Sequence, residues 1–207
     1  MFNCFGYHHQ TKGGLMKPIK PTPTCPEEEA YLKYIDEHRN YVYTAFLRFG
    51  KTICLALSLV HGEYDILRRH VSRHDISKYG TDEFNGYRQY FYAKEGEEKN
   101  KALFDKAWQH HYTNNPHHWE YYLEMPGHAD EMPKLNVAEM LLDWIAMSMK
   151  FKNSPITWYN QNKDRMILHK KTRDNVEQVL SVLSTETQYP FRIRRKARPR
   201  HIKNEHN

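Results

Sequence analysis

Cysteine is scarce in this chain. The 207 residues contain only Cys4, Cys25 and Cys54, and no two of them form a CxxC pair. An odd number of scattered cysteines argues against a disulfide framework and against a zinc site built on thiolates. We therefore expect a protein of a reducing compartment, the cytoplasm. Any metal ion that it holds must be bound by histidines and carboxylates.

Long apolar runs and common catalytic loops are also missing. The longest apolar stretch, residues 52–60, is far shorter than the roughly 20 residues needed to cross a bilayer. The first residues lack the basic and apolar segments of a secretory signal, so we expect no membrane partner. The sequence has no glycine-rich phosphate loop, GxSxG or HExxH motif, and P-loop, serine-hydrolase and zincin mechanisms therefore have no support.

The positive charge is concentrated at the C-terminus. The net charge is +6, and residues 191–207 contribute all of it with seven Lys or Arg and one Glu. Residues 1–190 carry 24 basic and 24 acidic side chains and are neutral. A basic tail can bind nucleic acid through counterion release, or it can be a solvated end of the chain. The sequence leaves both interpretations open.

Hydrophobic residues make up 39% of the chain, which is enough for one core. Residues 1–26 are rich in proline and glycine and predict an irregular leader, in which Met1 and Met16 are both suitable starts. Apolar residues then recur at helical spacing, and no alternating strand pattern occurs. The expected helices cover residues 26–49, 52–73, 81–92, 101–112, 135–151 and 164–184. We predict an all-α fold, a single bundle of five to seven helices over residues 27–190.

Histidine is abundant, with 14 residues, and some histidines and acids fall on predicted apolar faces. His38 lies in the stripe of the first helix, between Ile35 and Val42. Asp143 follows Glu139 by one turn on the face of a later helix. Taken singly, a core histidine satisfied by a hydrogen bond, or acids paired with basic neighbours, explains each of them better than a metal ion does.

A His-Asp doublet, His74-Asp75, lies in the stretch HDISK, where a helix is expected to end. In so histidine-rich a chain the doublet alone is a weak signal. Lys78 follows Asp75 by three residues. It can offset the charge of a bound phosphate, or it can be a surface lysine.

A second group of histidines lies in the stretch HHYTNNPHHW. His111 continues the apolar stripe of its helix, whereas His110 is one rotation step away. His117 and His118 follow a proline at the helix end, and either can turn inward. Four segments thus place imidazoles or carboxylates on inward faces, and these groups are ligands of Zn, Mn, Fe, Ni and Co. Because facing helices bring such ligands together, the pattern predicts a metal site.

The order His38, His74-Asp75, Asp143 resembles the HD superfamily of metal-dependent phosphohydrolases, which are all-helical proteins. The gaps resemble those of its 5′-deoxynucleotidase-like branch, although that branch has an acidic residue where this chain has Lys78. The stretches HDISKYGTDEFNGYRQYF, AWQHHYTNNPHHWEYY and AEMLLDWIAMSMKF also resemble a family of bacteriophage and bacterial proteins that has no assigned activity. The resemblance covers residues 27–160. For a phage protein, the expected compartment is the cytoplasm of the host cell.

The resemblance implies a ligand set and a reaction. One divalent ion (Mn, Ni, Co, Zn or Fe) would be held by His38, His74, Asp75 and Asp143, and a second by His111 with His118, or with His117 in its place. Asp75 would bridge the two ions, and Lys78 would face the substrate phosphate. The expected substrate is a nucleotide or a related small phosphoester.

Two alternatives remain. Some HD relatives are di-iron oxygenases, and their extra histidines and the lysine after their doublet resemble His111, His118 and Lys78. The other alternative is a non-enzymatic protein that binds nucleic acid or protein through residues 191–207. The sequence does not indicate an oligomeric state.

Overall fold

The computed structural model describes residues 17–125 and 127–186, and this part of the chain is all-α, as predicted. Its α-helices are α1 (Pro26–Ala56), α2 (His61–Arg73), α3 (Thr81–Phe91), α4 (Lys101–Asn114), α5 (Lys134–Phe151), α6 (Pro155–Asn162) and α7 (Lys170–Glu186). Short 3₁₀ turns η1 (Ile76–Tyr79), η2 (Trp119–Tyr122) and η3 (Lys163–Arg165) connect them, with a hairpin of β1 (Leu123–Met125) and β2 (His128–Ala129). The basic segment 191–207 lies outside the described residues.

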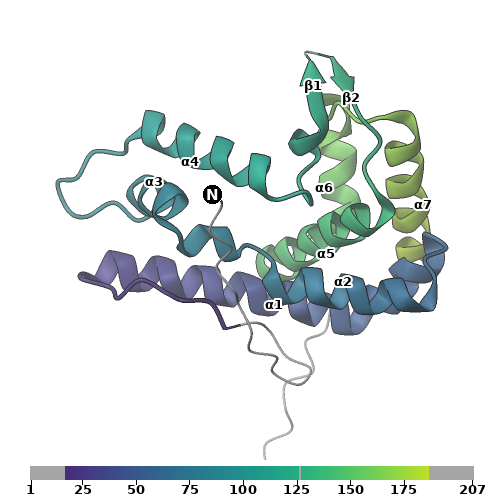
Figure 1. Cartoon of the computed structure of the whole chain (residues 1–207), viewed down its shortest axis with the longest axis horizontal. Coiled ribbons are helices and arrows are strands. Elements are labelled where there is room, and N and C mark those ends of the chain that lie inside the picture. Colours follow the sequence, from purple (N-terminus) through teal and green to yellow (C-terminus); the bar gives the residue numbers. More distant parts are fainter. Residues whose placement is uncertain (1–16, 126, 187–207) are drawn as a thin grey trace, which may run out of the picture.

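Helix α1 is the base of the fold, and α2 and α5 lie along it (Figure 1). Pro26 at its first turn and the acidic residues that follow suit a helix N-terminus. The predicted end near residue 49 is wrong, because the helix continues through Gly50 to Ala56. A methyl group at Gly50 would lie 2.8 Å from the ring of Phe46, so the glycine makes room for an aromatic side chain of its own helix.

Two apolar clusters divide the interior. The larger one joins α1, α2, α5, α6 and α7 around residues such as Val42, Val71 and Leu142. The smaller one joins the first half of α1 to α3 and α4 around Ile35 and Tyr79. His38 falls between Ile35 and Val42 on α1, so its side chain lies at the seam between the clusters.

Three details differ from the sequence prediction. Helix α6 was not expected; it begins after Ser154, whose Oγ accepts a hydrogen bond of 3.2 Å from the backbone N–H of Ile156. Helix α7 begins at Lys170, six residues later than predicted. The two short strands were also not expected, because they are too short to leave an alternating pattern. Among the described helices, none has the length and apolar character needed to span a membrane.

Candidate metal centre

The His-Asp doublet occupies the turn at which α2 ends. Arg73 is the last residue of the helix, and His74 already has an extended backbone, with φ −47° and ψ 130°. Asp75 then adopts the left-handed region at φ 57° and ψ 22°. Aspartate is one of the few residues besides glycine that visits this region, and such conformations cost on the order of 1–3 kcal/mol and gather at functional sites.

Arg39 fixes this turn from α1. Its Nε donates a hydrogen bond of 2.9 Å to the carbonyl of His74, and its Nη2 donates one of 2.9 Å to the carbonyl of Ser72. The last carbonyls of a helix have no partner within the helix, so a buried arginine is an effective cap for them. The position of the doublet is therefore set by the packing of α1 against α2.

One group of predicted ligands meets around His38. Its Nε2 lies 3.3 Å from Nε2 of His74, 3.3 Å from Oδ2 of Asp75 and 3.2 Å from Oδ1 of Asp143. The Nε2 of His74 is also 3.9 Å from the same Asp143 oxygen. These residues come from α1, the turn after α2, and α5, and all were expected from the sequence to share an ion.

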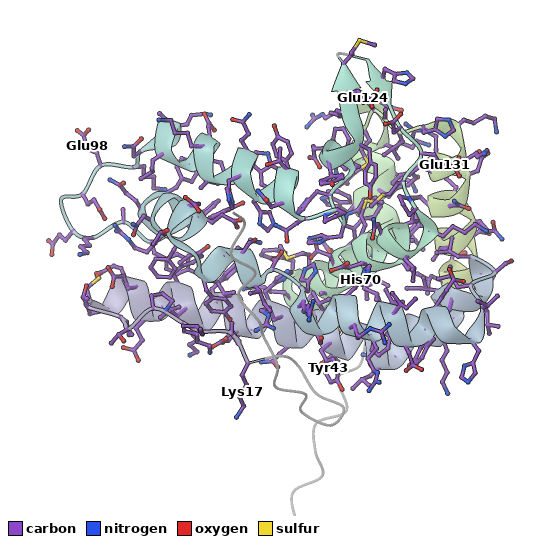
Figure 2. The ribbon with its side chains drawn as sticks, viewed as in Figure 1. Lys17, Tyr43, His70, Glu98, Glu124 and Glu131 are labelled. Carbon is purple, nitrogen blue, oxygen red and sulfur yellow. The ribbon has the colours of Figure 1, made fainter. Side chains whose placement is uncertain are left out.

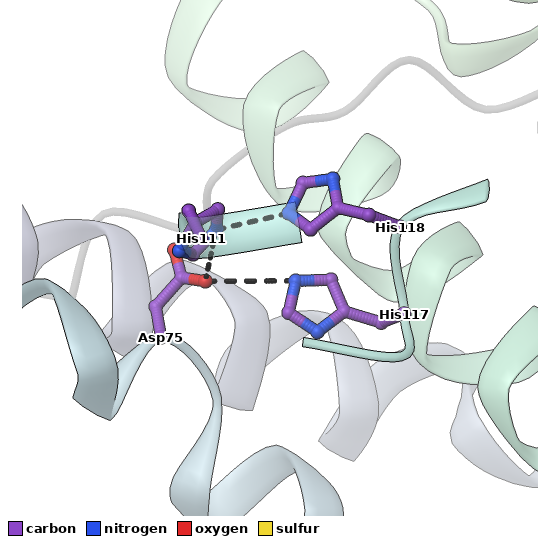
Figure 3. Close-up of side chains that lie close together, drawn as sticks. All are labelled: Asp75, His111, His117 and His118. Atoms are coloured by element: carbon purple, nitrogen blue, oxygen red, sulfur yellow. Dashed lines mark hydrogen bonds and ion pairs between the residues drawn. The ribbon is translucent and has the colours of Figure 1, made fainter. Parts of the chain in front are cut away.

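A second group meets at the other oxygen of Asp75 (Figure 3). Oδ1 lies 3.3 Å from Nε2 of His111 and 3.5 Å from Nε2 of His117. His118 joins them through its Nε2, which is 2.9 Å from Nε2 of His111. The sequence left open whether His117 or His118 is the ligand, and the structure places both imidazoles in the cluster. Both can reach it because α4 ends at Asn114 and the chain then turns.

His110 does not enter the cluster. Its Nδ1 lies 2.9 Å from Oε1 of Glu83, and more than a third of its side chain is exposed. His111 is fully buried, and its Nδ1 lies 2.7 Å from the other oxygen of Glu83. The helical stripe therefore predicted correctly that His111 is the inward residue of this pair. Glu83 contacts both histidines, with one carboxylate oxygen at each.

The donor atoms fit one or two divalent cations. Ligands about 2.0–2.2 Å from an ion lie roughly 3–3.5 Å from each other, and the distances between these atoms fall largely in that range. Three atoms of the cluster, Oδ1 of Asp75, Oδ1 of Asp143 and Nε2 of His117, are buried without a hydrogen-bond partner. Since unpaired buried polar atoms are costly, cations held by the two ligand groups would satisfy all three.

Two buried glutamates orient the histidines from outside. Oε1 of Glu139 lies 3.0 Å from Nδ1 of His74 and 3.5 Å from Nδ1 of His117, and its other oxygen lies 3.3 Å from Nδ1 of His70 (Figure 2). Glu83 does the same for His111. A carboxylate on the far nitrogen of an imidazole fixes the ring so that Nε2 faces the metal. This role was not predicted from the sequence: Glu139 was interpreted only as an acid paired with a basic neighbour, and Glu83 was not among the predicted site residues.

The charge states of Asp75, Asp143 and His118 suit cation binding. Burial raises the pKa of Asp75, but the Lys78 ammonium and the neighbouring histidines outweigh burial and hold this pKa well below its usual value. Burial also raises the pKa of Asp143, but the neighbouring His38 imidazole outweighs burial and lowers this pKa. Burial and the neighbouring His117 lower the pKa of His118, which keeps this imidazole in its neutral, metal-binding form.

Lys78 is part of the same cluster. Its Nζ lies 2.6 Å from Oδ2 of Asp75, and most of its side chain is buried. Burial lowers the pKa of Lys78, but the Asp75 carboxylate outweighs burial and raises the pKa above its ordinary value. The lysine is therefore a fixed cation beside the carboxylate that belongs to both ligand groups.

A cavity of about 370 Å³ opens onto the cluster. His117, His118 and Asp143 line it on one side, and side chains of α4, η2, α5, α6 and the segment around η3 form the remainder of its wall. Small-molecule sites in proteins typically occupy roughly 300–1,000 Å³. The cluster is thus accessible to a small molecule rather than sealed in the core.

The sequence is similar to one described family. A family model described as "Family of unknown function (DUF5662)" matches residues 27–182, which include every residue of the cluster. No curated protein and no solved structure matches the chain.

Proposed function

The chain belongs to the DUF5662 family of unknown function, and for this member we propose a metal-dependent phosphohydrolase that acts on a small phosphoester. The observation that supports this proposal is the position of Asp75, whose two oxygens lie in two different ligand groups. Oδ2 lies 3.3 Å from His38, and Oδ1 lies 3.3 Å from His111. A carboxylate placed in this way can bridge two ions.

The ligands divide naturally between two positions. One position lies near His38, His74 and Asp143, and the other lies near His111, His117 and His118. His117 also lies within reach of His74 and Asp143. Paired metals supply a nucleophile by lowering the pKa of bound water towards about 7, and they clamp the oxygens of a phosphoryl group during in-line displacement.

The remaining residues prepare this site. Glu139 and Glu83 hold the imidazoles with Nε2 facing inward. Lys78 places a permanent positive charge beside Asp75, where it would contact the phosphate oxygens and stabilise the charge that develops on them. The cavity would give a small phosphoester access to one side of the cluster.

The test begins with metal content, measured by elemental analysis of the parent protein and of the His74→Ala and Asp75→Asn variants. Asparagine tolerates the left-handed backbone of position 75, so this variant removes the charge without straining the turn. His61→Ala changes an exposed histidine and is the matched control. We expect stoichiometric metal in the parent and the control and its loss in both ligand variants. A parent protein without metal, or an Asp75→Asn variant that keeps its metal, contradicts the proposal.

Activity is then measured on a panel of nucleotides and other phosphomonoesters with Mn, Ni, Co, Zn and Fe. The histidine-rich ligand set also suits iron, which keeps the di-iron oxygenase as a second candidate. Bound iron with consumption of oxygen and no phosphate release would select the oxygenase. Phosphate release in the parent and its loss in Asp75→Asn would select the phosphohydrolase.

A further inference from the structure

All four tryptophans of the chain line a single cavity. Trp108 comes from α4, Trp119 from η2, Trp144 from α5 and Trp158 from α6, and each is half-buried. Trp108 packs against the smaller apolar cluster and the other three indoles pack against the larger one. Here every indole of the chain contributes to the wall of one small space beside the metal ligands. Indole faces bind flat rings by stacking.

The cavity wall also contains an unpaired carboxylate oxygen. Glu120 lines the cavity, and its Oε2 is buried without a hydrogen-bond partner. The nearest basic atom is Nδ1 of His118, at 4.0 Å, which is beyond hydrogen-bond distance. A buried carboxylate oxygen is costly unless a donor reaches it. A ligand in the cavity is the natural source of that donor.

We propose that this cavity selects phosphoesters whose alcohol part carries one flat ring system with an N–H donor. The ring would stack on the tryptophans and donate to Glu120, while the phosphate would lie at His117, His118 and Asp143. A volume of about 370 Å³ has room for one such unit. The inference rests on the proposed function only in placing the phosphate at the metal ligands.

The tryptophans themselves report binding, because all of them line the cavity. The metal-loaded protein is titrated with adenosine monophosphate, with adenosine, and with glycerol phosphate, which has no ring, and tryptophan fluorescence is recorded. We expect saturable quenching by the two ring compounds, tightest for the monophosphate, and little change with glycerol phosphate. Equal affinity for glycerol phosphate and adenosine monophosphate overturns the inference.

Variants separate stacking from general damage to the fold. Trp158→Leu removes the aromatic face, and Trp158→Phe keeps one. We expect the first to weaken binding of adenosine monophosphate by roughly 10-fold or more and the second to preserve most of it. Trp108→Leu, on another helix, repeats the test should Trp158→Leu not fold. Unchanged affinity in a folded leucine variant contradicts stacking.

Glu120→Gln tests whether the bound ring donates a hydrogen bond to the Glu120 carboxylate. This variant should weaken binding of adenosine monophosphate more than binding of its N6,N6-dimethyl derivative, because only the exocyclic amine of the first compound can donate to the carboxylate. Equal losses for both compounds, or no loss, contradict the role of Glu120. The outcomes remain distinct from those of the proposed function. Ring binding without phosphate release contradicts the phosphohydrolase and supports selection of ring compounds. Hydrolysis of ring and ringless esters at equal rates supports the phosphohydrolase and contradicts selection of ring compounds.

Discussion

Glu139 and His74 are 65 residues apart in the sequence, and Oε1 of Glu139 lies 3.0 Å from Nδ1 of the His74 imidazole. The same oxygen lies 3.5 Å from Nδ1 of His117, so one carboxylate orients an imidazole in each ligand group. Neither histidine can rotate without losing this contact. The geometry of the centre therefore depends on Glu139, which is not itself one of the proposed metal ligands.

Replacing this carboxylate should weaken metal binding without removing a ligand. We expect Glu139→Gln to lower metal affinity by about 10- to 100-fold, because the neutral amide orients the imidazoles less firmly and lowers their basicity. Competition with a chromophoric chelator measures the affinity. Glu124→Gln, at an exposed position of β1 (Figure 2), is the matched control. Equal affinities in the two variants would rule out the orienting role.

We expect replacement of Lys78 to lower kcat and to leave the metal content unchanged. Lys78→Met removes the cation beside Asp75 and leaves every proposed ligand in place. If the ammonium stabilises charge on the phosphate, kcat should fall by about 100-fold, and metal content should be unchanged. Lys106→Met, an exposed substitution on α4, serves as the comparison. A Lys78→Met enzyme with full kcat would leave the lysine only a structural partner of Asp75.

Arg39 is expected to couple stability to the metal site. Arg39→Met removes two charged hydrogen bonds to buried carbonyls of the α2 terminus. We expect the free energy of unfolding to fall by about 3 kcal/mol in urea denaturation, together with weaker metal binding. Arg69→Met, an exposed arginine of α2, should change neither property. Loss of stability with unchanged metal affinity would show that the doublet holds its position without this cap.

The closest approach between α3 and α4 gives a prediction about packing. A methyl group at Gly86 would lie 2.6 Å from Cβ of Ala107 and 2.7 Å from the carbonyl oxygen of Leu103. Gly86→Ala should therefore push α4 away and destabilise the protein by about 2 kcal/mol. His111 follows Ala107 by one turn, so metal affinity should fall as well.

A second glycine provides the control for this packing effect. A methyl group at Gly62 on α2 would meet no atom within 4 Å. Gly62→Ala should stabilise the helix by about 0.5 kcal/mol, because alanine has the better helix propensity. Thermal unfolding of both variants measures the difference, and a shift of the same sign in the two would contradict close packing at Gly86.

The sequence revealed the residues with strong local patterns. His38 and Asp143 were visible because each interrupts an apolar stripe of a long helix, and the all-α prediction followed from the same periodicity. Helix α6 was missed because eight residues are too few to establish a period. The helix end expected near residue 49 was wrong because α1 continues through Gly50, where the missing side chain leaves room for the ring of Phe46 one turn earlier.

Local sequence patterns did not predict which side chains from distant segments contact each other. Glu139 is visible on its stripe, but its partners lie on the turn after α2 and on the segment after α4. His117 and His118 follow the end of α4, where no period applies and their directions depend on how the chain turns. Residue types therefore indicated the chemistry of the centre, and only the packing of the helices indicated which carboxylate orients which imidazole.

The proposed ligands extend from residue 38 to residue 143 and come from three helices and two connecting turns. A chain in which any of these segments is detached would lack part of the ion's coordination sphere. Stoichiometric uptake of a divalent ion would therefore count the correctly assembled molecules in a preparation, and fragments that end before α5 should take up none at this site.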